Sequence, residues 1–499
     1  MSRDEHSISR MMPINVTLWT IWGAGLAAAY FLSLALFETS PWRALALIGA
    51  GVAVFAVRNF CLLVILLMTS SLITRGPVNI LGDITPFDVL VALMGAHAFI
   101  RIVVKRARVA LSREAKFMLL LLLLVFFSEA LGFLYFPRRL FMEASAKPFI
   151  QLLEFTVVMF ALVVCIDSKE QIEKIVRWQI ICAAFLAAVA IYEAQRGVIF
   201  FGDQSVFGTN EYSLRGDLKS NPNSLLLIIP AIAFLLYEKK RSPAKLALMA
   251  FILFPFIPQG TRTFYLALCG AVAGMLWLRR DRKTLWVIPV ALIAVFLNSA
   301  VVFPKVQEVF ESIHGYFKSP YAAEESSTFG RLILWKTAPQ IFVRHPLWGF
   351  GVNGYGMEIF ADPSVFSNER IMFAGWARGV VNPAGKTHNE YLQILLDHGA
   401  IAFAMAVYLL LQTLRKSLAM SDAGGKDMAW IYSALFVSFV AYMFASLSIS
   451  LLSYHGNNFL QVFFWLNTAL IYAPVNGSGA QAPALDAPMK QKGNRDNWK

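Results

Sequence analysis

Three arginines stand in short polar segments of this sequence, each next to a long apolar run. Arg215 lies in R-G-D-L-K-S-N-P-N, Arg262 in Q-G-T-R-T and Arg331 in F-G-R-L-I-L-W. A guanidinium group donates two parallel hydrogen bonds to a phosphate or pyrophosphate. If the three arginines reach one face of a membrane, we expect them to bind an anionic pyrophosphate there.

Arg262 is the most informative of the three, because apolar segments flank it with almost no loop between them. An arginine in such a position is costly unless it has an anionic partner or a water-filled cavity. The alternative is an interfacial arginine whose side chain extends to the lipid headgroups. That alternative explains a single arginine better than several polar groups on the same face.

His388 adds an imidazole to these cations. It lies in K-T-H-N-E-Y-L-Q, at the start of an apolar run. Thr387 offers an N-cap hydroxyl, and Glu390 three residues later completes the pattern of a capping box. We predict that His388 and Asn389 lie in the first turn of this helix and face the outer cavity. His388 would be a proton acceptor or an anion-binding group, or simply a structural residue at the helix start.

The run G-F-G-V-N-G-Y-G, residues 349–356, contains a match to G-x-G-x-x-G. The dinucleotide-binding interpretation requires a preceding strand and a βαβ unit, and neither is predicted here. We expect a flexible turn after a helix at 330–344, which is stopped by Pro346. In its functional form, backbone N–H groups around Gly351 and Gly354 would approach a phosphate or a sugar.

Two acidic residues, Glu129 and Glu193, lie near the ends of apolar runs that should reach the same face. An acidic side chain in a membrane segment needs a partner. We expect one of them to pair with an outer arginine, as a structural ion pair or as part of the site.

The composition sets the class of protein that must position these residues. Of the 499 residues, 58% are hydrophobic and only 15% are charged, and the mean hydropathy is +0.59. These values exclude a soluble enzyme, a disordered scaffold and a secreted disulfide module. The remaining class is an all-α polytopic integral membrane protein surrounded by membrane lipid. The net charge of +13 is explained by topology, and we expect no nucleic-acid partner.

About 14 apolar segments are long enough to be helices, and some fall short of the ~20 residues of a straight span, so we predict 12–14 transmembrane helices. The first, 18–37, is expected to remain as a membrane helix and not as a cleaved signal. The segments are 18–37, 42–57, 60–73, 84–104, 117–136, 148–166, 175–192, 224–237, 244–257, 263–278, 285–303, 391–414, 430–452 and 457–474.

Lysines and arginines are concentrated in the short loops on one side of these segments, which places both termini in the cytoplasm. Four regions follow: a membrane bundle at 1–303 with an outer loop at 193–223, an extracytoplasmic cap at 304–390, membrane helices at 391–474, and a disordered cytoplasmic tail at 475–499. The cap is predicted to be ordered, with helices at Lys305–Phe317 and Gly330–Arg344.

All four cysteines fall inside apolar runs, so we expect buried thiols and neither disulfides nor metal ligands. No cluster of residues has metal-ligand spacing. We therefore predict no metal and no cofactor.

The tract from Gly330 to Gly356, followed by T-H-N-E-Y-L-Q-I-L-L-D-H-G-A-I from Thr387 to Ile401, resembles the shared core of O-antigen ligases and O-antigen polymerases. The segments around Arg215 and Arg262 resemble the earlier arginine-bearing outer loops of that family. The resemblance covers about residues 200–415, and the remaining N-terminal spans match only in being a helical bundle.

This resemblance implies a GT-C-like, metal-independent glycosyltransferase of the bacterial inner membrane, with its site on the periplasmic face. The donor would be an oligosaccharide or polysaccharide on undecaprenyl pyrophosphate. The acceptor would be lipid A–core in a ligase, or a lipid-linked glycan in a polymerase. Arg262 and His388 would then be catalytic, and Arg215, Arg331, Asn389, Gly351 and Gly354 would bind substrate.

The spacing of His388, Asn389 and Gly399 is similar to that of the ligases, which favours ligation. Ala402 stands where the ligases usually have Gly, Thr or Tyr, so the polymerase alternative stays open. A transporter or flippase for an anionic lipid-linked substrate is the alternative from another class. Transporters usually hold their polar site near the bilayer midplane, whereas the polar residues here gather at the outer face.

Overall fold

The computed structural model describes the helical bundle, part of the cap and the segment around His388. The described residues are 59–72, 85–103, 113–196, 224–238, 242–255, 262–278, 307, 310–311, 314, 327–362, 387–423, 428–448 and 459–473.

These residues form helices joined by turns, and no strand occurs among them. Each predicted apolar segment that falls within them corresponds to a helix, whereas 18–37, 42–57 and 285–303 lie outside the described residues. The helices are α3 (Phe60–Ser71), α4 (Pro86–Val103), α5 (Arg113–Tyr135), α6 (Arg138–Cys165), α7 (Lys169–Arg196), α9 (Leu225–Tyr237), α10 (Pro243–Leu253), α11 (Arg262–Leu278), α14 (Ser327–Phe342), α15 (Gly354–Ala361), α18 (Glu390–Ala423), α19 (Ala429–Ala445) and α20 (Val462–Tyr472).

Several of these helices have the length and composition of membrane spans. Four are at least 18 residues long and strongly apolar, and six shorter apolar helices accompany them. The all-α polytopic membrane class is thus confirmed. The four long segments are Arg113–Tyr135, Pro148–Cys165, Lys169–Tyr192 and Glu390–Asp422.

The helix α5 shows how a nearly uniform apolar run acquires an inside and an outside. Its buried residues include Val125, Ser128, Glu129 and Gly132, which recur at the spacing of one helix face. Large apolar side chains such as Leu123 remain exposed on its other faces, as expected for contact with lipid. Ser128 and Glu129 therefore point into the protein.

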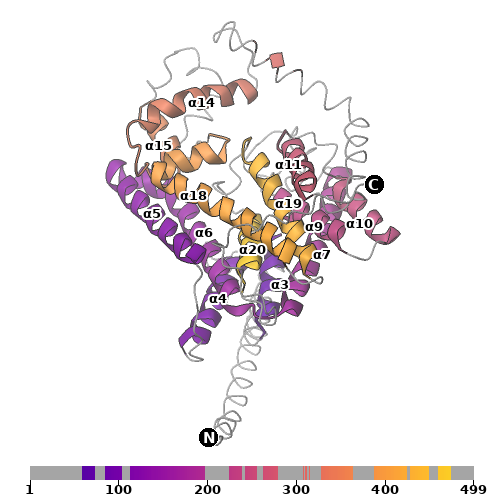
Figure 1. The fold of residues 1–499 in the computed structure, drawn as a ribbon. Helices are drawn as coiled ribbons and strands as arrows, with labels where there is room; N and C mark the ends of the chain where they lie inside the picture. Colours follow the sequence, from indigo (N-terminus) through magenta and orange to yellow (C-terminus); the bar gives the residue numbers. More distant parts are fainter. Residues whose placement is uncertain are drawn as a thin grey trace, which may run out of the picture.

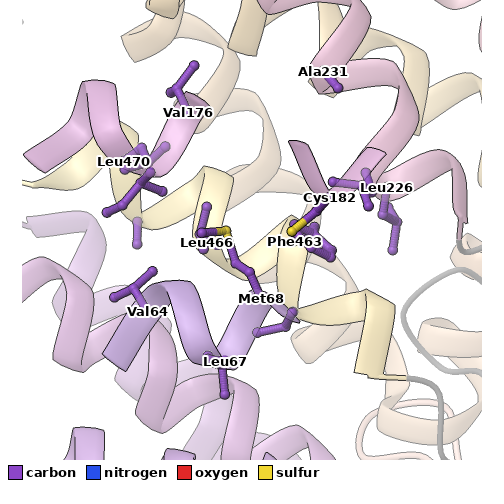
Figure 2. Packing of buried hydrophobic residues seen from close by; sticks show 14 of the residues in the cluster. Val64, Leu67, Met68, Val176, Cys182, Leu226, Ala231, Phe463, Leu466 and Leu470 are labelled. Carbon is purple, nitrogen blue, oxygen red and sulfur yellow. The ribbon is translucent and has the colours of Figure 1, made fainter. Parts of the chain in front are cut away.

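The main core is formed where α3, α7, α9 and α20 pack together (Figure 2). Cys182 lies in this core, and Cys61 and Cys165 are buried as predicted. Cys269 differs: it is a free thiol exposed on α11. The prediction of four buried thiols was wrong at this position, because an apolar helix in a membrane has a lipid-facing side that composition alone does not distinguish from a buried side.

Helices α11 and α19 approach each other through small residues. A Cβ placed on Gly270 would lie 2.9 Å from the Cα of Ala441, and one on Gly274 would lie 3.2 Å from the Cα of Val437. Glycines four residues apart allow two helix backbones to come this close. This contact fixes α11, whose first residue is Arg262.

The described part of the cap lies at one end of the bundle, where α14 and α15 sit next to α18 and the end of α5 (Figure 1). The predicted helix at Gly330–Arg344 corresponds to α14, which begins three residues earlier. The predicted helix at Lys305–Phe317 lies mostly outside the described residues, although residues 307, 310, 311 and 314 are helical.

A second core joins this cap to the membrane helices. It contains Phe136 and Phe141 from the α5–α6 corner, Leu334 and Tyr355 from the cap, and Leu396 from α18. The Tyr355 hydroxyl donates to the carbonyl of Leu334 at 3.0 Å. Burial raises the pKa of Tyr355, so this hydroxyl keeps its proton and its hydrogen bond. The cap is therefore anchored to the bundle by packing and not by chain connectivity alone.

Candidate functional site

Helix α18 is interrupted at Gly399, and the interruption is where the cap docks. Gly399 has φ 78° and ψ 176°, far from helical values. The carbonyl of Asp397 accepts the N–H of Phe350 at 3.0 Å and that of Gly351 at 2.8 Å, and the Ala400 N–H donates to the Pro346 carbonyl at 2.8 Å. Backbone groups freed from the helix thus bind the loop between α14 and α15.

Glycine is required on both sides of this contact. A Cβ on Gly399 would overlap the carbonyl of Leu347, and one on Gly349 would overlap the carbonyl of Asp397. Both glycines have positive φ, which side chains disfavour. Gly399, noted in the sequence for its spacing from His388 and Asn389, is therefore required because two backbones approach each other closely here.

Asp397 holds the start of α15 through its side chain. It is 2% exposed. Its Oδ2 accepts from the N–H of Asn353 at 3.1 Å and from Nε2 of Gln393 at 2.9 Å, and its Oδ1 accepts from the N–H of Tyr355 at 3.3 Å. The first N–H groups of a helix have no partner within that helix. The Asp397 carboxylate on α18 therefore accepts hydrogen bonds from two backbone N–H groups at the start of α15.

Glu129 has a similar role on the other side of the loop. Its Oε2 accepts from the N–H of Val352 at 2.8 Å, and a Cβ on Gly351 would lie 3.1 Å from that oxygen. The expected arginine partner is replaced by a backbone amide. The Glu193 side chain lies outside the described residues.

The glycine-rich turn consequently directs its backbone donors inward. The Gly351 N–H binds Asp397, and the Gly354 N–H binds the Gly351 carbonyl at 2.8 Å. These two N–H groups are thus engaged within the protein. A contact of Gly351 and Gly354 with substrate stays a prediction, and it would depend on the shape of the turn.

The start of α18 differs from the predicted capping box. The N-cap is Asn389, whose Oδ1 accepts from the N–H groups of Tyr391 at 3.0 Å and Leu392 at 3.2 Å. Thr387, the expected N-cap, instead donates its backbone N–H to Oε1 of Gln393 at 3.0 Å. The amide of Asn389 reaches both donors of the first turn, so it outcompetes the threonine two residues earlier.

His388 therefore precedes the first turn of α18 and does not lie in it. It is half-buried and adopts φ 52°, a left-handed conformation that is uncommon outside glycine. The preceding carbonyl, that of Thr387, accepts from Nε1 of Trp335 on α14 at 2.8 Å. The backbone at His388 is thus held by a cap helix on one side and by the N-cap of α18 on the other.

The chain segments next to two predicted site residues, His388 and Arg262, meet at one turn that follows α19. The Ser446 carbonyl accepts the N–H of Glu390, two residues after His388, at 2.9 Å. Ser448 Oγ donates to Oγ1 of Thr263, the residue after Arg262, at 2.9 Å. The starts of α18 and α11 therefore meet at residues 446–448, although 126 positions separate Arg262 from His388 in the chain.

Of the three predicted arginines, Arg331 is the one whose side chain lies within the described residues. Arg331 is half-buried on α14, one turn before Trp335, so the two residues share a helix face. That face reaches the segment containing His388. The Arg262 side chain and all of Arg215 lie outside the described residues, so their contacts stay predictions.

A narrow cavity of about 200 Å³ opens below this junction. Its wall includes Glu390 and Ser446 at the junction and continues along α18 to Thr413. Most of the lining is apolar, from α5, α6, α18, α19 and α20. An apolar wall of this kind is compatible with contact with a lipid chain.

Sequence reasoning assigned no role to Ser128, Asp397 or His398. His398 lines the cavity, and its Nδ1 lies 2.8 Å from Ser128 Oγ. The available signal was a pair of polar residues, Asp397 and His398, within an apolar run. Among the described residues, no group of three or more His, Cys, Asp or Glu side chains could hold a metal ion.

Within its described residues, the chain is an all-helical, multi-spanning membrane protein with a docked cap and a polar junction beside a mostly apolar cavity. Residues 246–407 match the family model for O-antigen ligase, which supports the O-antigen ligase and polymerase family predicted from the sequence. The match includes Arg262, Arg331 and His388 but not Arg215. None of the curated proteins matches the chain.

Proposed function

We propose that the protein is a glycosyltransferase that moves a glycan from undecaprenyl pyrophosphate to an acceptor at the periplasmic face of the bacterial inner membrane. The observation that carries this proposal is the convergence of the α11 and α18 starts, next to Arg262 and His388, beside a mostly apolar cavity, and both starts lie within the matched O-antigen ligase region. The fold would be of the GT-C kind and the chemistry independent of metal.

In this proposal the arginines hold the pyrophosphate of the donor. Arg262 directly precedes Thr263, which contacts Ser448 at the junction. Arg215 and Arg331 would complete the anion site. As the bond between the anomeric carbon and the pyrophosphate oxygen breaks, negative charge grows on the leaving group. Guanidinium groups that are already in place stabilise that charge without reorganisation.

His388 would act on the acceptor. The acceptor hydroxyl attacks the anomeric carbon and its proton passes to the imidazole, while the lipid pyrophosphate leaves with the bonding electrons. Because a pyrophosphate is a good leaving group, help by an acid is not needed there. Asn389 contributes by fixing the start of α18, and thereby the backbone that carries His388.

The cavity supports a lipid-linked donor over a soluble one. Its apolar wall runs from the junction along α18, so a lipid-linked donor would lie against it with its pyrophosphate and sugar at the end near Arg262 and His388. A transporter would be expected to hold its polar site near the midplane. Here the polar junction lies at the end of the bundle beneath the cap (Figure 1).

Purified protein supplied with a lipid-linked glycan and lipid A–core tests the proposal directly. We expect a new glycosidic bond and release of the lipid pyrophosphate. Movement of the glycan lipid across a membrane without any new bond would instead show a transporter.

Ligation to lipid A–core is favoured over polymerisation by the spacing of His388, Asn389 and Gly399. A deletion strain separates the two roles. Loss of a ligase leaves long polymer that is not attached to lipid A–core. Loss of a polymerase leaves single repeat units attached to it.

A further inference from the structure

His398 is a second histidine close to the junction, and the proposed chemistry does not use it. It lies in the cavity wall between Asp397 and the interruption at Gly399. Its Nδ1 is 2.8 Å from Oγ of Ser128 on α5. Ser128 is fully buried and does not line the cavity.

The hydrogen bonds of Ser128 favour one placement of the hydrogen on the His398 ring. The Ser128 hydroxyl lies 2.9 Å from the carbonyl of Val125, to which it donates. With its one hydrogen directed to that carbonyl, Ser128 Oγ is left to accept from an Nδ1–H of His398. In that tautomer Nε2 is an acceptor, while Nδ1 is turned toward Ser128, which does not line the cavity.

The contacts of the neighbouring loop favour a position of His398 near the membrane interface over one at the midplane. The loop between α14 and α15 docks on α18 at this height. Trp348 of that loop stacks edge-on against Phe127 of α5, with ring centroids 5.0 Å apart, and is 37% exposed. Tryptophan is typical of membrane–water interfaces. A polar headgroup would therefore lie at the height of the His398 ring.

Three other polar residues of the cavity wall are hydrogen-bonded within the protein. The Tyr391 hydroxyl donates to the Met443 carbonyl at 3.0 Å, and the Tyr442 hydroxyl donates to the Leu226 carbonyl at 2.8 Å. Both oxygens of Asp397 accept from the cap and from Gln393. Nε2 of His398, the ring nitrogen that does not contact Ser128, is the candidate for a ligand contact.

We propose that Nε2 of His398 accepts a hydrogen bond from a sugar hydroxyl of a lipid-linked glycan, and that Ser128 is the positioning residue for the ring. The identity of the ligand rests on the proposed function. A neutral acceptor distinguishes a hydroxyl, which offers a hydrogen, from an ionised pyrophosphate, which offers none. His398 therefore binds a hydroxyl of the sugar, while the arginines bind the phosphates.

The test measures binding by the full-length protein in lipid nanodiscs. One probe is a polyprenyl pyrophosphate carrying a sugar, and the other is the same lipid pyrophosphate without sugar. His398→Asn keeps an amide N–H that can reach Ser128 but removes the group at Nε2. Ser128→Ala removes the positioning contact. Thr468→Val is the matched control, because the Thr468 hydroxyl lines the cavity but donates to the Phe464 carbonyl at 2.9 Å.

We expect His398→Asn to weaken binding of the sugar-bearing lipid by about fivefold to tenfold, the usual effect of one hydrogen bond. Binding of the sugar-free lipid should not change, Ser128→Ala should show a smaller loss with the same selectivity, and Thr468→Val should bind both probes normally. Equal losses for both lipids would mean a contact with phosphate and would overturn the proposal. So would unchanged binding of both.

A second measurement uses the wild-type protein and does not depend on the variants folding. Among lipid-linked sugars that each lack one hydroxyl, one analogue should bind about fivefold to tenfold more weakly. That difference should disappear in His398→Asn, as expected when two changes remove one contact. If every analogue binds like the parent sugar, the hydrogen bond does not exist. Since binding needs no turnover, a protein that binds selectively but forms no glycosidic bond would contradict the proposed function alone.

Discussion

Arg262 carries the strongest prediction at the scale of single residues. Replacing it with alanine should lower transfer by about 10²–10³-fold, the typical cost of losing one group that stabilises developing negative charge. Lysine should restore only part of the activity, because it supplies a point charge without a planar pair of donors. Transfer by membranes with equal protein levels measures both variants.

Arg344 provides the matched arginine control on the cap. Asp362 at 2.8 Å and Glu358 bind its guanidinium, and both raise the pKa of Arg344. Because exposed ion pairs contribute only about 0–1 kcal/mol, Arg344→Gln should retain nearly full transfer. Full activity of Arg262→Ala would remove Arg262 from the site.

His388 can be tested through the pH dependence of transfer. An unperturbed imidazole titrates near 6.5, and a general base is active only when deprotonated. Wild-type activity should therefore fall as the pH is lowered through that range. An imidazolium that binds phosphate would show the opposite dependence.

The variant His388→Gln keeps the size and hydrogen bonding of the side chain but cannot take the proton. We expect it to lose about 10²–10⁴-fold in rate and to lose the pH dependence as well. Near wild-type transfer by this variant between pH 6 and 8 would rule out the general-base role.

At the scale of elements, the docking of the cap on α18 depends on Gly399. In Gly399→Ala the Cβ overlaps the Leu347 carbonyl, and the left-handed backbone alone costs about 1–3 kcal/mol. The loop between α14 and α15 should leave α18. We expect a lower unfolding temperature and faster proteolysis within residues 343–353, together with loss of transfer.

Ala400→Gly is the control for this prediction. It changes the neighbouring residue of the same helix but keeps the N–H that donates to the Pro346 carbonyl at 2.8 Å. A glycine in a helix costs at most about 1 kcal/mol, so proteolysis of the loop should stay slow. Equal proteolysis of both variants would mean that a weakened α18, and not the undocked loop, is responsible.

For the whole molecule, the testable property is orientation. The distribution of lysine and arginine predicts cytoplasmic termini and an external cap. A fluorescent protein fused to the C-terminus should fluoresce, whereas alkaline phosphatase there should be inactive. Alkaline phosphatase inserted at residues 363–386 should be active. The reverse pattern would place the junction on the wrong face for the proposed acceptor.

The sequence by itself determined the class of protein and the presence of most described helices. These depend on local quantities: an apolar run long enough to cross a bilayer can hardly be anything other than a helix. The predicted segments at 117–136 and 175–192, which correspond to α5 and α7, illustrate this, although α7 begins six residues before its predicted segment. His388 and Arg331 became candidate site residues because polar residues that interrupt such runs are costly and therefore conspicuous.

Only the tertiary structure decided which distant groups meet. Glu129 binds an amide 223 positions away, and the starts of α11 and α18 join at the end of α19. The proposed role of His398 depends on Ser128, which only the tertiary structure brings beside it. Hydrophobic periodicity fixes which face of a helix turns inward, but many helix arrangements satisfy it equally well. The choice among them is made by close backbone approaches at Gly270, Gly349 and Gly399 and by buried carboxylates that must find donors, and these depend on contacts far apart in the chain.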